Sequence, residues 1–359
     1  MLLRRIAAGL VVLVALSGCG SGGAAENAAE TATPVPSPTS TPTPELTPTL
    51  TADQLAQVKP NELGQIMVLM YHTIDDSGDD YARTADGLRE DLQWLYDNGF
   101  YVIPIDDYIN DEIAAPAGKR PVVLTFDDGT VSQFRYIVNA DGSKMIDPDC
   151  AVGILENFFT RHPDFGRGGL FSILPLAPFA WPDAEDQRPY AQEKIRWLLD
   201  HGYQIGNHTV GHVNFSELTD EEIKAELAGA IEEIRTYAPD AQPTVLAVPF
   251  GVYPAGGDTT LFEGFDYHGQ HYALTGALMV GANPAPSPVD GEFDPYWIPR
   301  IRGSQEELDK WFGFAEENPG IIYVSDGNPE AITIPEEVDP WLAGTLDEAK
   351  IGSKTLIRY

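Results

Sequence analysis

The chain has 359 residues, in which 55 Asp and Glu outnumber 22 Lys and Arg, giving a formal net charge of −33 at pH 7. A protein that follows nucleic-acid phosphates needs a basic surface, so this composition argues against a nucleic-acid partner. The length suits one large domain or two ordinary ones. Two cysteines, Cys19 and Cys150, are too few for a disulfide framework.

The first residues have the features of a secretion signal. Arg4 and Arg5 precede an apolar run over 6–16, which is too short for an ordinary membrane span. The run ends in Leu-Ser-Gly-Cys, which resembles a bacterial lipobox and implies cleavage before Cys19 and lipid attachment to its sulfur. The alternative is an ordinary signal peptide with an incidental cysteine. We therefore expect a signal peptide over 1–18 and a lipid-anchored lipoprotein on the outer side of the cell membrane.

Residues 19–60 are rich in Thr and Pro and show no apolar periodicity. Such a segment cannot bury a core, so we expect an extended, mobile tether. At roughly 3 Å per residue, about 40 residues in a polyproline-like conformation would reach ~100 Å. The folded domain is expected to begin near Asn61 and to extend over 61–359.

Apolar runs alternate with amphipathic helices along this domain. Helices are expected after Asp86, over 151–160 and 190–200, and after the capping sequences that begin at Thr219 and Ser304. Buried strands are expected at 66–70, 100–105, 122–126, 170–174, 203–206, 244–248, 272–280 and 321–324. This alternation predicts a parallel α/β barrel or an open α/β sheet in a single domain.

Two adjacent carboxylates stand where one of the expected core strands ends. The strand closes in Thr-Phe-Asp-Asp-Gly over 125–129, which contains Asp127 and Asp128. In α/β folds the carboxyl ends of the strands are where ligands are held. By itself the pentapeptide would also suit an ordinary Asp-Gly turn.

Two histidines four residues apart follow another expected strand. If the segment turns helically, His208 and His212 project to one side, within reach of a single cation. As a pair alone they would equally suit polar loop residues. Asp128 becomes a third ligand if its strand end adjoins this loop, and zinc accepts imidazole and carboxylate together. Asp127 is then free to take a proton from bound water.

Together these motifs resemble the NodB-homology polysaccharide deacetylases, carbohydrate esterase family four, over roughly residues 61–330. The resemblance implies a distorted (β/α)₇ barrel and one divalent metal, with zinc the first choice. It makes Asp127 the general base and Asp128, His208 and His212 the metal ligands. Val-Pro-Phe-Gly over 248–251 is similar to the third motif of the family. In that motif the backbone N–H of the aromatic residue, here Phe250, helps to stabilise the oxyanion.

The chain departs from the family pattern at two places. Ala247 stands where an arginine commonly orients the base, and Arg300 or Arg302 is the candidate replacement. The late Leu-x-His that supplies the general acid is expected near 322–325, where no histidine occurs. A Tyr-His at the first strand, as in a subset that includes deacetylases of poly-N-acetylglucosamine, makes His72 the acid instead.

We therefore expect a monomeric, metal-dependent enzyme that deacetylates an N-acetylated polysaccharide of the N-acetylglucosamine type outside the cell. Two alternatives remain open: an esterase acting on O-acetylated xylan-like polymers, and a non-catalytic glycan-binding lipoprotein with a degenerate site. No Gly-x-Ser-x-Gly elbow or phosphate-binding glycine loop supports other hydrolase or nucleotide-enzyme classes. Trp181, Tyr253 and Trp297 are candidates for stacking on sugars, although aromatic residues are more often part of a core.

Overall fold

The structure, a computed structural model, describes residues 50–281, 283–337 and 344–359, which lie within one compact unit, Leu46–Tyr359. The expected signal peptide, Cys19 and the expected tether as far as residue 49 lie outside the described residues and stay predictions. Within the described part, no helix combines the length and the apolar character that a membrane span requires.

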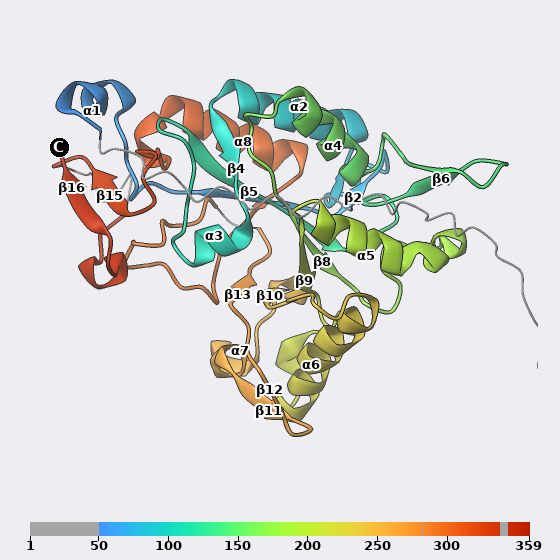
Figure 1. Ribbon diagram of the computed structural model, residues 1–359. Coiled ribbons are helices and arrows are strands. Elements are labelled where there is room, and N and C mark those ends of the chain that lie inside the picture. The colour runs from blue at the N-terminus through green and yellow to red at the C-terminus, as the bar shows by residue number, and fades with distance from the viewer. Residues whose placement is uncertain (1–49, 282, 338–343) are drawn as a thin grey trace, which may run out of the picture. The chain divides into compact units, whose positions relative to one another are not determined.

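The central element is one curved parallel sheet of eight strands (Figure 1). The path through the sheet takes its strands in the order β13 (Gly276–Leu278), β10 (Val245–Ala247), β9 (Gln204–Asn207), β8 (Leu170–Ile173), β5 (Arg120–Asp128), β1 (Met67–Tyr71) and β14 (Ile301–Arg302). The eighth, β4 (Phe100–Val102), pairs with the first residues of β5. Because both faces are covered, strands β1, β5, β8 and β10 consist largely of apolar residues.

A single chain segment brings the two edges of the sheet together. Ile301 in β14 pairs with Leu69 in β1, and Ile298, three residues earlier, forms a parallel bridge with Leu278 in β13. The sheet therefore curls toward a ring of seven strands. This arrangement confirms the prediction of a distorted (β/α)₇ barrel in a single domain.

Helices cover the outer face of the sheet and a second core fills its inside. Figure 1 shows α2, α4 and α8 along one side. Their apolar faces pack on residues of β1 and β5 such as Leu69 and Leu124, whereas Val68 and Val123, which alternate with them, belong to the inner cluster. The helices are α1 (Ala52–Val58), α2 (Ala85–Asp97), α3 (Ile105–Ile109), α4 (Ala151–Arg161), α5 (Ala191–Asp200), α6 (Asp220–Tyr237), α7 (Thr260–Glu263) and α8 (Gln305–Glu317).

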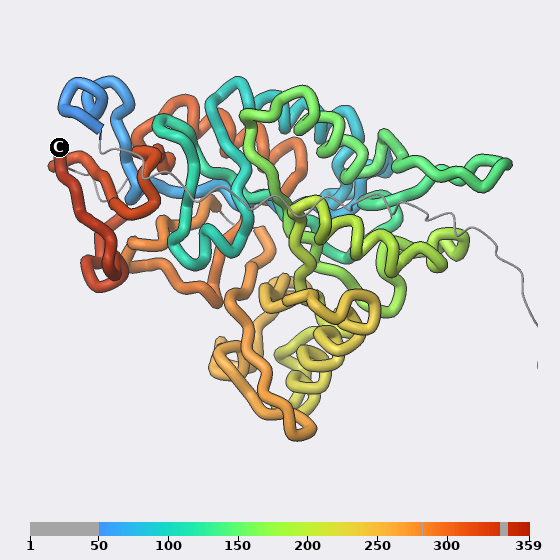
Figure 2. Tube along the Cα trace, in the orientation of Figure 1, coloured from blue at the N-terminus to red at the C-terminus, as the bar shows by residue number. Residues whose placement is uncertain are grey.

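Short two-stranded sheets surround the barrel, and one of them lies in the insertion after β5. This hairpin extends away from the rest of the unit (Figure 2). The pairs in the described residues are β2 (Thr73–Ile74) with β3 (Ala82–Arg83), β6 (Tyr136–Val138) with β7 (Lys144–Ile146), β11 (Phe265–Tyr267) with β12 (Gln270–Tyr272), and β15 (Ala331–Ile334) with β16 (Thr355–Arg358).

Two of the expected strands differ in the structure. The run 321–324 forms no barrel strand: it begins in a 3₁₀ turn, and only Ile322 and Val324 make isolated bridges. Residues 272–280 are divided between β12 and β13. The apolar residues of 321–323 are buried in either arrangement, so their pattern alone could not distinguish a strand from a packed loop.

The expected tether also ends earlier than residue 60. Helix α1 begins after Thr51, whose side chain accepts a hydrogen bond from the Gln54 N–H, while the Gln54 side chain accepts one from the Thr51 N–H. This capping box accounts for a helix within a segment expected to be disordered. The helix has no buried residues, which is why apolar periodicity did not reveal it.

Candidate active site

Strand register brings the two sequence motifs to the same edge of the barrel. On β8, Ile173 pairs with Asp128 of β5 on one side and with Asn207 of β9 on the other. Asp128 and the residue just before His208 are therefore level with each other at the carboxyl ends of neighbouring strands. The histidine loop leaves β9 at this point and returns His212 to the same place through positive φ angles at Thr209 and His212.

Asp128, His208 and His212 converge on one point. Their donor atoms all lie within 4.8 Å of one another. The Asp128 Oδ1 atom is 3.2 Å from His208 Nε2 and 3.6 Å from His212 Nε2. His208 is almost fully buried, whereas His212 is partly open to solvent. Two imidazoles and a carboxylate are the ligand types that zinc and similar cations accept while keeping positions open for water.

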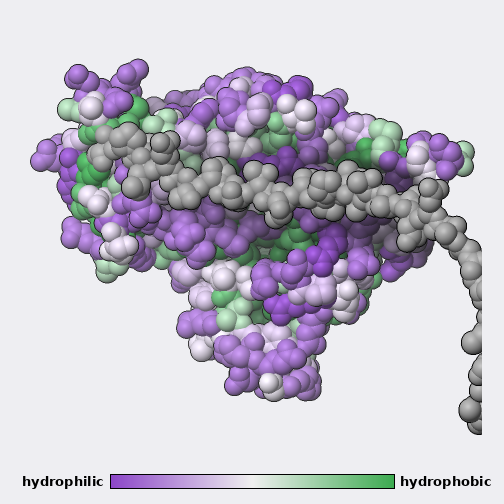
Figure 3. All heavy atoms as spheres, viewed as in Figure 1, coloured by the Kyte–Doolittle hydropathy of each residue, from purple (hydrophilic) through white to green (hydrophobic). Residues whose placement is uncertain are grey.

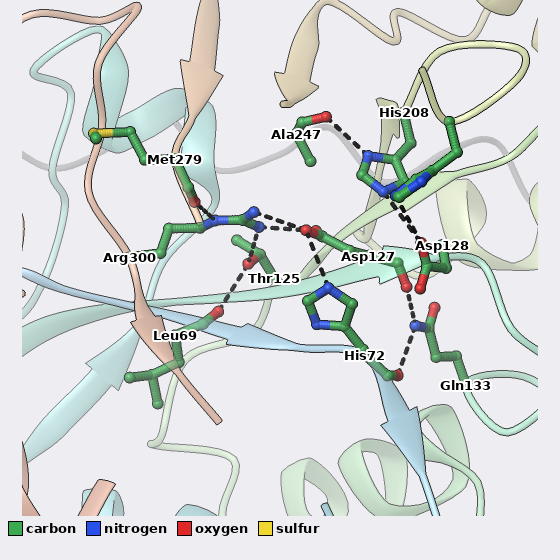
Figure 4. Close-up of polar contacts among 11 residues, drawn as sticks. Leu69, His72, Thr125, Asp127, Asp128, Gln133, His208, Ala247, Met279 and Arg300 are labelled. Carbon is green, nitrogen blue, oxygen red and sulfur yellow. Dashed lines mark hydrogen bonds and ion pairs between the residues drawn. The ribbon is translucent and has the colours of Figure 1, made fainter. Parts of the chain in front are cut away.

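The protonation of His208 supports this assignment. Its Nδ1 atom lies 2.8 Å from the Ala247 carbonyl oxygen, which can only accept, so Nδ1 carries a proton (Figure 4). The lone pair on Nε2 of the neutral ring then faces the Asp128 carboxylate. Burial would lower the pKa of His208, but Asp128 and Asp127 raise it above 6.5. Positive charge therefore belongs between these atoms, as a proton or as a cation, and the three side chains fit a divalent metal.

Arg300 holds the other carboxylate of the motif. It donates from Nη1 to Asp127 Oδ1 at 2.8 Å and from Nη2 to Oδ2 at 2.7 Å (Figure 4). The same guanidinium donates to Thr125 Oγ1 and to the Met279 carbonyl. Both partners of the ion pair are fully buried. Burial alone would raise the pKa of Asp127, but Arg300 holds it well below its usual range.

The structure thus places an arginine beside Asp127 although Ala247 stands at the family position. Of the two candidates that the sequence offered, Arg300 makes the contact. Arg302 instead stacks over the ring of Tyr81, with its guanidinium carbon 4.5 Å from the ring centre. The arginine stands directly before β14 and not in β10.

His72 lies between Asp127 and a pocket. Its Nε2 atom is 3.9 Å from Asp127 Oδ2, and its side chain is 14% exposed. The ring of Tyr81 packs edge-on against it, with 4.8 Å between ring centres. Burial lowers the pKa of His72 below 6.5, against the opposing effect of Asp127 and Asp128. The imidazole is therefore neutral near pH 7 in this state.

A pocket of about 440 Å³ opens over these residues. Three aromatic side chains that are unusually exposed for their size line it: Tyr81 (38%), Trp181 (43%) and Phe250 (60%). Phe250 has a positive φ of 58° and packs edge-on against His212. Asp127 does not line the pocket, although His72, Asp128 and His212 do.

Several pocket residues were not foreseen from the sequence. The loop between β2 and β3 contributes Asp75, Ser77 and Asp79 to one wall, and its residues match none of the motifs considered in the sequence. Of the three aromatic residues considered for sugar stacking, only Trp181 lines the pocket. Tyr253 and Trp297 stack on each other, 3.8 Å between ring centres, and so serve the core. The acidic residues shortly after His72 were the sequence signal that could have indicated this wall of the pocket.

Comparisons with known proteins agree with these motifs. A family model described as Polysaccharide deacetylase matches residues 179–259. YxkH of Bacillus subtilis, named among the polysaccharide deacetylases, is 21% identical over 205 residues, 56% of this chain and 62% of that protein. A chitooligosaccharide deacetylase of Bradyrhizobium is 26% identical over 137 residues, 38% of this chain and 49% of that protein. The matches thus span about half to three fifths of these curated relatives.

Solved structures show the same fold. A Bacillus anthracis protein assigned to the polysaccharide deacetylases superimposes with a TM-score of 0.50 at 17% identity, over 70% of this chain and 68% of that one. A polysaccharide deacetylase from Bacillus cereus gives a TM-score of 0.50 at 17% identity, over 69% of each chain. The family match, the curated relatives and the ordered motifs agree, and the chain therefore carries a polysaccharide deacetylase domain of the NodB-homology type.

Proposed function

We propose that this protein is a metal-dependent hydrolase that removes N-acetyl groups from a polysaccharide of the N-acetylglucosamine type. The observation that carries the proposal is the convergence of Asp128, His208 and His212 at the pocket, with Asp127 and His72 beside them. The ion pair between Arg300 and Asp127 counts against the non-catalytic alternative, because the missing arginine at position 247 was one of the two departures from the family pattern that favoured it.

Asp128, His208 and His212 are the residues that would hold the metal. A divalent cation bound there supplies Lewis-acid polarisation of water and of the acetyl carbonyl. Asp127, kept ionised by Arg300, accepts the proton of the attacking water. The Phe250 N–H, in the left-handed turn at the pocket, is the donor for the oxyanion.

His72 delivers a proton to the leaving amine. Because its pKa is lowered, the resting imidazole is neutral, and the proton has to come from the reaction itself. Asp127 Oδ2, 3.9 Å from His72 Nε2, is placed to pass on the proton taken from water. The balance is complete: hydroxide joins the acetyl carbon, the C–N bond breaks and the amine gains the proton.

The lining of the pocket favours an amino-sugar polymer over an anionic one. Asp75 and Asp79 stand on one wall, and no Lys or Arg of residues 50–281, 283–337 and 344–359 lines the pocket. Carboxylates would repel uronic acids or phosphates, whereas a deacetylated product carries ammonium groups. The exposed rings of Trp181 and Tyr81 suit sugar faces.

The test is acetate release from N-acetylglucosamine oligomers and from acetylated xylan, measured at one pH with the zinc-loaded enzyme. Faster release from the amide substrate is expected. A chelator should abolish turnover and added zinc should restore it. Acetate release from xylan alone would favour the esterase, and none from either, with metal bound, would favour the glycan-binding protein.

The same assay tests the two acid–base roles. Asp127→Asn should lose turnover while keeping its metal, because a neutral amide cannot accept the proton. His72→Ala should lose ~10²-fold or more on the amide and less on the ester, since an alkoxide leaves more easily than an amine. Normal amide turnover in either variant would remove that residue from the mechanism.

We also propose that the enzyme works outside the cytoplasm, anchored by lipid at Cys19. The basic start, the apolar run and the Leu-Ser-Gly-Cys sequence support this location. Metabolic labelling with a fatty acid, compared between the wild-type protein and Cys19→Ala, is the appropriate measurement. Equal label in both would exclude the anchor.

A further inference from the structure

Gln133 lies behind the two proposed acid–base residues, outside every sequence motif. Its side chain is fully buried. Its Nε2 atom donates one hydrogen bond to the His72 carbonyl at 2.8 Å and one to the Asp127 carbonyl (Figure 4). A carboxamide has two N–H groups, so both are used, one on each of two different strand ends.

The bonds are made where the β-ladder stops. The last paired residues of β1 and β5 are Tyr71 and Phe126, each directly before the residue whose carbonyl Gln133 binds. Beyond this point the chain after β1 turns away into β2, so backbone pairing no longer sets the distance between His72 and Asp127. The Gln133 carboxamide links the two chains where the backbone pairing between β1 and β5 has ended.

The glutamine itself is rigidly mounted. Its N–H donates to the Thr130 carbonyl, and its own carbonyl accepts from the N–H of Val152 in the first turn of α4. These two bonds fix the main chain that carries the carboxamide. The Gln133 Oε1 atom is buried and has no hydrogen-bond partner among the described residues. The polar contacts of the carboxamide are therefore those made by its two N–H groups.

We propose that Gln133 is a positioning residue that sets the spacing of His72 and Asp127 by joining the ends of β1 and β5. This inference rests on the proposed function, because the spacing matters only if a proton passes between the two side chains. Errors of about 1 Å in such geometry cost up to about 100-fold in rate, while substrate binding depends on other residues.

The experiment compares Gln133→Met, which keeps the volume and removes both donors, with Gln133→Glu. A carboxyl buried against two carbonyl oxygens takes up a proton and can restore one of the bonds. We expect kcat to fall between about 10- and 100-fold in Q133M, with KM and zinc content within twofold of wild type, and Q133E to be intermediate.

Gln204→Met is the matched control. Gln204 also joins two elements by its carboxamide, accepting from the Ile105 N–H and donating to Asp106, but it lies at the start of β9, at the other end of the barrel. The Q204M variant should have a lower melting temperature but should not show the fall in kcat expected of Q133M. A Q133M enzyme with kcat within twofold of wild type, or a Q204M enzyme with the same loss, overturns the proposal.

A second readout does not need turnover. In zinc-loaded protein with ¹⁵N-labelled histidine rings, the titration of His72 should move to lower pH in Q133M, because Asp127 then stabilises the imidazolium less. It should be unchanged in Q204M. An unchanged His72 titration in Q133M overturns the inference even if the wild-type enzyme proves inactive, whereas inactivity of the wild type by itself counts only against the proposed function.

Discussion

At the scale of single residues, the departure from the family pattern at position 247 is compensated in space. The guanidinium of Arg300, the residue directly before β14, reaches the Asp127 carboxylate through two parallel hydrogen bonds. A fully buried guanidinium and carboxylate are tolerated because each neutralises the other and the remaining donors bind Thr125 and Met279. The threonine of the Thr-Phe-Asp-Asp-Gly motif thus helps to hold the arginine.

Removing that arginine should harm both stability and rate. Arg300→Met leaves a buried carboxylate without its partner and should lower the free energy of unfolding by ~3–5 kcal/mol. Arg300→Lys keeps the charge but loses the two-point contact, so it should retain more stability while turnover falls at least ~10-fold. Arg302→Met, two residues further along the chain in β14, is the control for both measurements. Full activity in the lysine variant would show that orientation of Asp127 is unimportant.

At the scale of elements, α5 supports the segment that carries Trp181 to the pocket. Lys194 of α5 is fully buried and donates to the Phe179 carbonyl and to Gln187 Oε1. The N–H of Phe179 in turn donates to the Gly129 carbonyl, next to Asp128. Two acceptors satisfy the two N–H groups of a neutral amine but not the three of an ammonium ion.

Burial lowers the pKa of Lys194 to about 7, against about 10.4 in the unfolded chain. Between these values the unfolded state binds more protons, so this group makes stability rise with pH, by at most about 1.4 kcal/mol per pH unit. The free energy of unfolding of wild type minus that of Lys194→Met should therefore increase from pH 7 to pH 10, in urea titrations. If the difference in the free energy of unfolding between wild type and Lys194→Met did not change with pH, the buried lysine would have to stay charged.

At the scale of the whole molecule, acidity is the dominant property. The chain carries 55 acidic against 22 basic residues, and hydrophilic residues cover most of the coloured surface in Figure 3. A field of this sign attracts cationic polymers and repels anionic ones. The product of the proposed N-deacetylation is cationic, whereas the proposed acetylated substrate is neutral.

Ionic strength should therefore change the affinity for the cationic product and leave the affinity for the neutral substrate unchanged. Raising salt from about 10 to about 150 mM shortens the screening length from ~30 to ~8 Å. Inhibition by glucosamine oligomers should weaken over this range, while KM for N-acetylglucosamine oligomers stays within twofold. In the double variant Asp75→Asn/Asp79→Asn, the salt dependence of this inhibition that remains measures the contribution of the charges outside the pocket. Equal salt dependence for the neutral and the cationic oligomer would contradict the explanation.

The sequence by itself determined the alternating α/β class and, through the resemblance of its motifs, the candidate chemical groups. Those signals are local: apolar runs mark β1, β5 and β8, and short motifs contain Asp128 and His212. The tertiary structure alone decided which arginine meets Asp127, because the two residues are 173 positions apart and the contact depends on the closure of the sheet by β14. It likewise decided that Trp181 rather than Tyr253 lines the pocket and that Gln133 joins two strand ends. Side-chain contacts of this kind depend on the packing of distant segments, which no local pattern encodes.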